Sequence, residues 1–179
     1  MKAVIAFLKK ILLAIELIFA FALIHWEKTL FLAVLALDQF SKMYVVNSMT
    51  LGASIPIVEK FFHITYVLNP GAAFGILPNQ RVFFLIIGIM LLIWFALFYP
   101  RIKKFGLLIR VATITGVSGS TANLIDRFQT GYVIDFLDFK IWSPVFNFAD
   151  VAITLSMIVI LYFVIFKMED DGNLKEARR

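Results

Sequence analysis

The chain has 179 residues, of which 61% are hydrophobic and only 16% are charged. A soluble domain usually has about a quarter charged residues and under half apolar ones, so this composition argues against a water-soluble globule. Cysteine is absent, which excludes disulfides, thiolate nucleophiles and cysteine–zinc clusters, and two histidines are too few for a histidine-rich metal site. The net charge of +5 comes mostly from basic residues at the ends of apolar runs, an arrangement that orients membrane proteins and does not indicate nucleic-acid binding.

The N-terminal stretch contains an apolar run, residues 11–24, that is interrupted by Glu16 and is too short to span a bilayer. A polar group, His25-Trp26-Glu27-Lys28, follows it directly. We therefore expect residues 1–28 to form an N-terminal segment with a helix in the cytoplasmic membrane interface. The alternative is a cleavable signal peptide, because lysines precede the apolar core and Ala20-Phe21-Ala22 has the small-x-small form. Cleavage there would invert every later span against its basic flanks.

Four later segments reach, or nearly reach, the length of about 20 apolar residues that a transmembrane helix needs. They are residues 29–46, 82–99, 105–125 and 148–166. Pro100 and the basic residues after it predict a short turn that makes an antiparallel hairpin of the second and third spans. With both termini in the cytoplasm, twelve of the seventeen Lys and Arg residues fall on that side, as the positive-inside rule requires. The sequence thus predicts an all-α membrane protein with four transmembrane helices.

The two long connections, about residues 47–81 and 126–147, then lie outside the cytoplasm. Both are rich in β-branched and aromatic residues, at Ile55, Ile57, 61–67 and 132–142. Such a composition predicts short strands outside the membrane.

Ionisable residues at membrane depth are costly, so each one needs a partner or a function. Asp38 and Lys42 lie four residues apart, on one helix face, where they can form an ion pair that is either structural or catalytic. The predicted topology brings other polar groups to the same outer edge of the bundle. These are Asn123, Asp126, Arg127, Asp135, Asn147 and Asp150.

Carboxylates at this edge fit two kinds of function. One is proton or ion coupling in a small transporter, with Asp38 and Asp126 as coupling groups. The other is acid–base chemistry, because two adjacent carboxylates share a proton, so that one acts as a base toward water and the other donates to the developing oxyanion. This second arrangement is that of an aspartic protease and needs neither a metal nor a cofactor.

Gly116-Val117-Ser118-Gly119 also fits the GxSG pattern of rhomboid-type serine proteases. Such an enzyme needs a histidine near the serine, whereas His25 precedes the first span and His63 lies in an outer loop. Four spans are also fewer than the six or more of rhomboids. We interpret the small residues as helix-packing residues.

Four blocks, in order, resemble the lipoprotein signal peptidases (signal peptidase II). They are residues 38–42 (DQFSK), 69–75 (NPGAAFG), 123–127 (NLIDR) with 131–136 (GYVIDF), and 146–150 (FNFAD). The resemblance covers residues 29–168, a four-span peptidase domain, and leaves 169–179 as a charged cytoplasmic tail. One departure is Ala122, which adds a methyl group where the family usually has glycine and where close helix approach is expected.

The resemblance implies an aspartyl endopeptidase of the bacterial inner membrane, with its active site on the extracytoplasmic side beneath a small β-platform and a lid. Its implied substrate is a diacylglyceryl-prolipoprotein, cut before the lipid-modified cysteine, and Asp135 and Asp150 are the implied catalytic pair. Asp126 is implied to support the site, by pairing with Arg127 or by ordering a loop. The other implied supporting or substrate-binding residues are Asp38, Lys42, Asn69, Gly71, Asn123, Arg127 and Asn147. We expect globomycin-type inhibition, a monomer, contacts with membrane lipid, no nucleic-acid partner, and no metal or cofactor.

Overall fold

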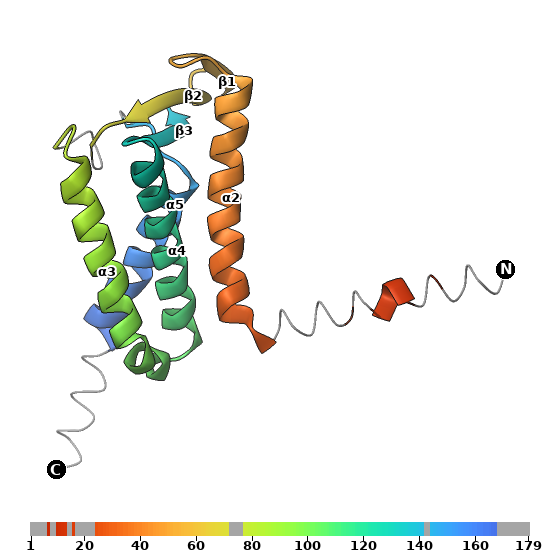
Figure 1. Cartoon of the computed structure of the whole chain (residues 1–179), viewed down its shortest axis with the longest axis vertical. Coiled ribbons are helices and arrows are strands. Elements are labelled where there is room, and N and C mark those ends of the chain that lie inside the picture. The colour runs from red at the N-terminus through yellow and green to blue at the C-terminus, as the bar shows by residue number, and fades with distance from the viewer. Residues whose placement is uncertain are drawn as a thin grey trace, which may run out of the picture.

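The computed structural model describes residues 7, 10–13, 16, 24–71, 77–141 and 144–167. In this part of the chain, four long helices run along one another and a small sheet covers one end of the bundle (Figure 1). The helices are α2 (Trp26–Ser48), α3 (Arg81–Ile102), α4 (Leu107–Gln129) and α5 (Phe148–Tyr162), the last continued by a π-helical turn, η3 (Phe163–Lys167).

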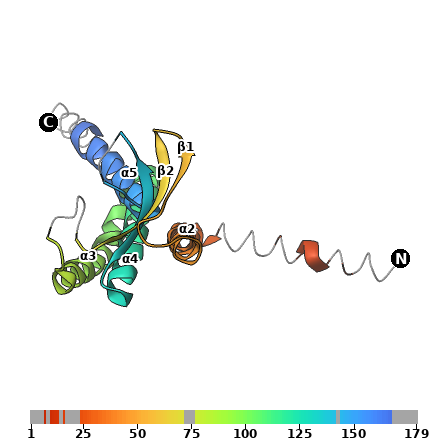
Figure 2. The ribbon, with the colours of Figure 1, turned by 90° about the horizontal axis from the view of Figure 1, so that it is seen from above.

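Three stretches within the described residues are helices long and apolar enough to cross a membrane: Trp26–Ser48, Arg81–Phe105 and Phe148–Phe166. The helix α4 is equally long but more polar, and it packs against α2, α3 and α5 (Figure 2). Its polar face is therefore covered by protein. By contrast, no residue of α3 is buried, and its large apolar side chains are exposed, as a lipid-facing helix requires.

The hairpin between α3 and α4 differs from the prediction. The helix α3 continues past Pro100 to Ile102, a short 3₁₀ helix, η2 (Lys103–Phe105), follows, and the chain turns at Gly106 with φ of 87°. The prediction that the helix ends before Pro100 is therefore wrong, because a proline in the last turn removes only one intrahelical hydrogen bond.

Much of the N-terminal prediction falls outside the described residues. Of the expected interfacial helix at 11–24, the structure describes only residues 11–13, 16 and 24, and the expected tail at 169–179 lies outside. The helix α2 begins at Trp26, three residues before the predicted start of the first span.

The predicted strands are confirmed. The strands β1 (Ser54–Val58), β2 (Phe62–Asn69) and β3 (Val133–Phe139) form one antiparallel sheet in the order β1-β2-β3. Phe136 and Leu137 of β3 pack with Val45 of α2 into a core beneath the sheet. The free edge of β3 binds Phe146, whose carbonyl oxygen accepts hydrogen bonds from the amides of Phe136 and Leu137. This contact brings the start of α5 next to β3.

Candidate functional site

Asp150 lies in the first turn of α5 and is held there by the N-cap of the helix. The side chain of Asn147, the N-cap residue, accepts a hydrogen bond from the Asp150 amide at 2.9 Å. In return, Asp150 Oδ2 accepts a hydrogen bond from the backbone N–H of Asn147 at 3.2 Å. This reciprocal capping box fixes the carboxylate at the helix N-terminus, where the helix dipole favours negative charge.

The same asparagine also contacts Asp135, in the middle of β3. Asn147 Nδ2 donates to Asp135 Oδ1 at 2.7 Å, and Asn69 Nδ2, at the end of β2, donates to Asp135 Oδ2 at 2.9 Å. Asp135 is 1% exposed, whereas Asp150 is only partly buried. Asn147 therefore contacts both carboxylates, Asp135 through its side-chain NH₂ group and Asp150 through its backbone N–H, and of the two aspartates Asp150 is the more open to solvent.

The electrostatic environment of Asp135 differs from that of an ordinary surface carboxyl group. The pKa of Asp135 is raised to about 7. Burial is the main cause of this rise, and the negative charge of Asp150 is the second. Hydrogen bonds from Asn69 and Asn147 act in the opposite direction. A carboxyl group with this pKa carries a proton in about half of the molecules at neutral pH.

A buried lysine lies beneath the two aspartates. Lys42 is 2% exposed, and its Nζ lies 2.7 Å from Asp38 Oδ2 and 2.7 Å from Asp126 Oδ2. It also donates to Asn123 Oδ1 at 2.8 Å, while Asn123 Nδ2 donates to Asp150 Oδ1 at 2.8 Å. Because Lys42 occupies the oxygen of the Asn123 side-chain amide, the NH₂ group of that amide points at Asp150. Through Asn123, Lys42 links its ion pairs with Asp38 and Asp126 to Asp150.

The Asp38–Lys42 pair predicted from the four-residue spacing is confirmed. Of the two roles implied for Asp126, pairing with Arg127 is not the one that the structure has, because adjacent residues on a helix face different directions, whereas ordering a neighbouring loop agrees with its contact to the start of β3. Asp126 instead binds Lys42 and Gln39, and its Oδ2 accepts from the Ile134 amide at 3.4 Å, at the start of β3.

Arg127 holds the chain that leads from β2 toward α3. Its guanidinium donates to the carbonyl oxygen of Gly71 at 2.9 Å and stacks over the ring of Phe84 at 4.9 Å. The Gly71 amide donates to Asn69 Oδ1 at 2.9 Å. Because Gly71 occupies that oxygen, the Asn69 NH₂ group points at Asp135.

All the site residues expected from the sequence belong to one continuous network of hydrogen bonds and ion pairs. Its members are Asp38, Lys42, Asn69, Gly71, Asn123, Asp126, Arg127, Asp135, Asn147 and Asp150.

Gln39 is a further member of this network, to which the sequence alone assigned no role. Its Nε2 donates to Asp126 Oδ1 at 2.9 Å, and its polarity within an apolar span was the signal for it. Among the described residues, no cluster of three or more His, Asp or Glu side chains is arranged to hold a metal ion.

The surroundings of Ser118 are those of a residue that packs one helix against another. It is completely buried, and its hydroxyl donates to the carbonyl oxygen of Phe31 at 2.6 Å, which ties α4 to α2. His63 lies in β2 and is hydrogen-bonded to Ser54 at 3.1 Å. Ser118 is therefore a helix-packing residue in this geometry.

The departure at Ala122 is accommodated without loss of packing. Ala122 is fully buried, and its carbonyl oxygen accepts from Gln39. A close approach of α4 to the backbone of α5 lies one turn earlier, at Gly119, where a Cβ atom would lie 2.6 Å from the carbonyl oxygen of Ala149. At Gly116 a Cβ atom would likewise collide with Ser156 Oγ, so Gly119 and Gly116 are positions on α4 that leave no room for a side chain against α5.

Comparison with known proteins shows the family to which the chain belongs. Residues 30–166 match the family model of signal peptidase (SPase) II. The lipoprotein signal peptidase of Halothermothrix orenii is 42% identical over 132 residues, covering 73% of this chain and 90% of that protein. That of Clostridioides difficile is 40% identical over 133 residues, covering 74% and 89%.

Two solved structures, each described as a bacterial membrane enzyme, have the same fold. The first has a TM-score of 0.74 and 35% identity, and covers 84% of this chain and 92% of its own. The second has a TM-score of 0.72 and 34% identity, and covers 80% and 94%. By sequence and by fold, this chain belongs to the signal peptidase II family of membrane peptidases.

Proposed function

We propose that this chain removes the signal peptide from diacylglyceryl-prolipoproteins, cutting before the lipid-modified cysteine, with Asp135 and Asp150 as the catalytic pair. The observation that carries the assignment of the pair is the position of Asn147, which contacts both carboxylates. Membership of the family supports the reaction, and the relatives give no support to the alternative of an ion-coupled transporter.

The different surroundings of the two aspartates support different roles. Asp135 is the acid, because burial raises its pKa to about 7 and keeps a proton on it near neutral pH. Asp150 is the base, because it is partly open to solvent and accepts hydrogen bonds from Asn123 and from the Asn147 amide, which stabilise a carboxylate.

Peptide cleavage then needs one water molecule and four proton transfers, two as the intermediate forms and two as it breaks down. Asp150 takes a proton from the water molecule while the water oxygen bonds to the carbonyl carbon of the peptide. At the same time, Asp135 donates its proton to the carbonyl oxygen. When the carbon–nitrogen bond breaks, Asp150 gives its proton to the leaving amine of the cysteine. A hydroxyl proton of the intermediate returns to Asp135, so that both groups regain their starting states.

The location that we propose is the bacterial inner membrane, with four spans, cytoplasmic termini and the sheet outside. Burial of the polar face of α4 supports its role as a membrane span, the third in chain order, beside the three more apolar helices. The basic residues of the turn after α3 lie at the end of the bundle opposite the sheet, which supports the orientation (Figure 1). In this orientation the diacylglycerol anchor holds the scissile bond at the membrane surface, near Asp150.

Purified Asp135→Asn and Asp150→Asn variants test the proposal on a synthetic diacylglyceryl-prolipoprotein. We expect each to lose at least about 10²–10⁴-fold in cleavage rate, because an amide neither supplies nor accepts the proton. Asp138→Asn is the matched control, since Asp138 is also a buried aspartate of β3 but is bonded to Thr65 and Lys140, outside the network. Globomycin inhibition of the wild type identifies the activity. Cleavage by a folded Asp135→Asn or Asp150→Asn variant at the wild-type rate would remove that residue from the pair.

A further inference from the structure

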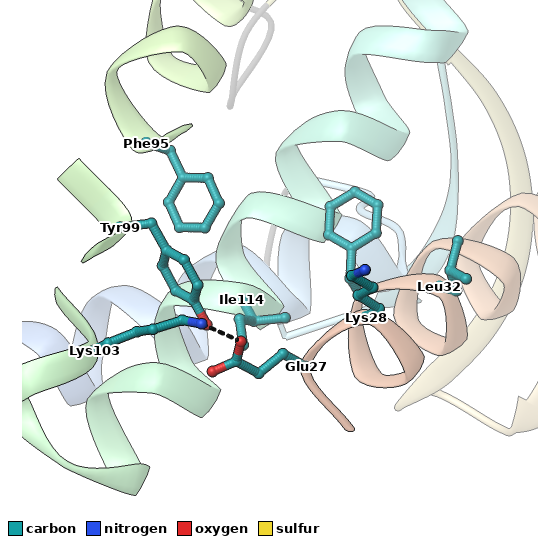
Figure 3. A pocket seen from close by; sticks show the side chains of 8 residues that line it. Glu27, Lys28, Leu32, Phe95, Tyr99, Lys103 and Ile114 are labelled. Atoms are coloured by element: carbon teal, nitrogen blue, oxygen red, sulfur yellow. Dashed lines mark ion pairs between the residues drawn. The ribbon is translucent and has the colours of Figure 1, made fainter. Parts of the chain in front are cut away.

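A cavity of about 460 Å³ lies between α2, α3 and α4, at the end of the bundle opposite the aspartates (Figure 3). It exists because α2 and α3 both pack on α4 but make little contact with each other. Its volume falls within the range of about 300–1,000 Å³ that is typical of ligand sites. No part of the proposed proteolysis uses it.

The inner part of this cavity is apolar. Phe31 and Leu32 of α2, Phe95 of α3 and Ile114 of α4 line it, and Leu32 is 59% exposed toward the side of the bundle. Because these helices lie in a membrane, the opening faces lipid. An apolar space is a poor site for water, whereas a hydrocarbon chain fills it favourably.

The outer part of the cavity is charged, and its net charge is positive. Glu27 is paired with Lys103 at 3.0 Å (Figure 3). Glu27 also accepts a hydrogen bond from Arg110 Nε at 2.9 Å. Lys28 also lines the cavity and is exposed. The residues that line the cavity thus carry one carboxylate and two ammonium groups, which leaves a net positive charge for an anionic group. Arg110, which is not part of the lining, is fixed by its bond to Glu27 and by stacking on Trp26 at 4.8 Å.

We propose that this cavity binds one anionic phospholipid, with an acyl chain along the apolar wall and the phosphate between Lys28 and Lys103. Basic pockets between transmembrane helices attract anionic headgroups. In this cavity the inner apolar part directly adjoins the outer, positively charged part. A free phosphate ion lacks the chain that fills the wall, and a zwitterionic lipid gains less from the net positive rim. The proposal is independent of the proteolytic function.

The experiment is lipid retention measured by native mass spectrometry. The protein is purified into nanodiscs that contain equal amounts of phosphatidylglycerol and phosphatidylcholine, then released and weighed. We expect the wild type to retain one phosphatidylglycerol in preference to phosphatidylcholine. The Lys28→Gln/Lys103→Gln variant loses this retention at least about tenfold, while Glu27 keeps Arg110 as its partner.

Arg101→Gln/Lys104→Gln is the matched control, because it removes the same charge near the same end of the bundle from residues that do not line the cavity. We expect it to retain the lipid. Leu32→Trp keeps every charge but narrows the apolar wall, so its loss of lipid separates a chain-binding cavity from general charge attraction. Equal retention of both lipids by the wild type, equal loss in the matched control, or displacement of the lipid by excess inorganic phosphate would overturn the proposal.

Discussion

Replacing Lys42 with methionine is the most informative single change in this structure. The lysine ammonium lies within 2.8 Å of three oxygen atoms, on Asp38, Asp126 and Asn123. Methionine fills most of the volume of the side chain but supplies neither charge nor donor. Two buried carboxylates would then face each other without a cation, and the Asn123 amide would lose the group that orients it.

The expected loss of stability follows from the burial of these groups. Removing one partner from a buried ion pair costs about 3–5 kcal/mol, because the remaining charge has no solvent. For a chain of this length, 1 kcal/mol shifts the unfolding temperature by about 2–4 °C, so we expect a fall of about 6–20 °C. Cleavage falls as well, by about tenfold to a hundredfold in the fraction that remains folded, because Asp150 is no longer held in place.

Tryptophan fluorescence during heating is a suitable readout, since the chain has three tryptophans and lacks the cysteines that thiol dyes require. A Lys42→Met variant that also carries Asp38→Asn and Asp126→Asn separates stability from positioning. This variant removes the two carboxylate charges that have no cation beside them. We therefore expect it to reverse at least half of the decrease in unfolding temperature, while the cleavage rate stays low. The reasoning is refuted if Lys42→Met unfolds at the wild-type temperature, or if the triple variant regains full activity.

Two further predictions concern pH and the buried serine. Because folding raises the pKa of Asp135 from 3.8 to about 7, its stabilising contribution is complete below about pH 4 and is lost as the pH rises through 7. The unfolding temperature of the wild type should therefore fall between pH 4 and 8 more steeply than that of Asp135→Asn, and parallel curves would contradict this assignment. Ser118→Ala should keep full cleavage activity and lose only about 0.5–1.5 kcal/mol of stability with the hydrogen bond to Phe31. A folded but inactive Ser118→Ala protein would instead indicate serine chemistry.

The sequence was sufficient for most of the architecture, because local patterns carry it. Long apolar runs specify helices in a membrane, where every backbone group must be bonded within its own segment. Segments rich in β-branched and aromatic residues predicted short strands where the sheet lies, and four-residue spacing predicted the Asp38–Lys42 pair. The end of α3 was misplaced because proline at a helix terminus costs much less than proline in a helix interior.

The partners within the site were decided only by the tertiary structure. Lys42 meets Asp126 and Asn123, which lie more than 80 positions away, because α2 packs against α4. The family resemblance had suggested that Asp126 pairs with its neighbour Arg127 or orders a loop. A helical or strand repeat determines which side chains share a face, but contact between faces depends on how the helices approach one another, and Gly119 permits that approach for α4 and α5. The position of Asn147 against both aspartates, and with it the raised pKa of Asp135, exists only once β3 and the start of α5 have packed together.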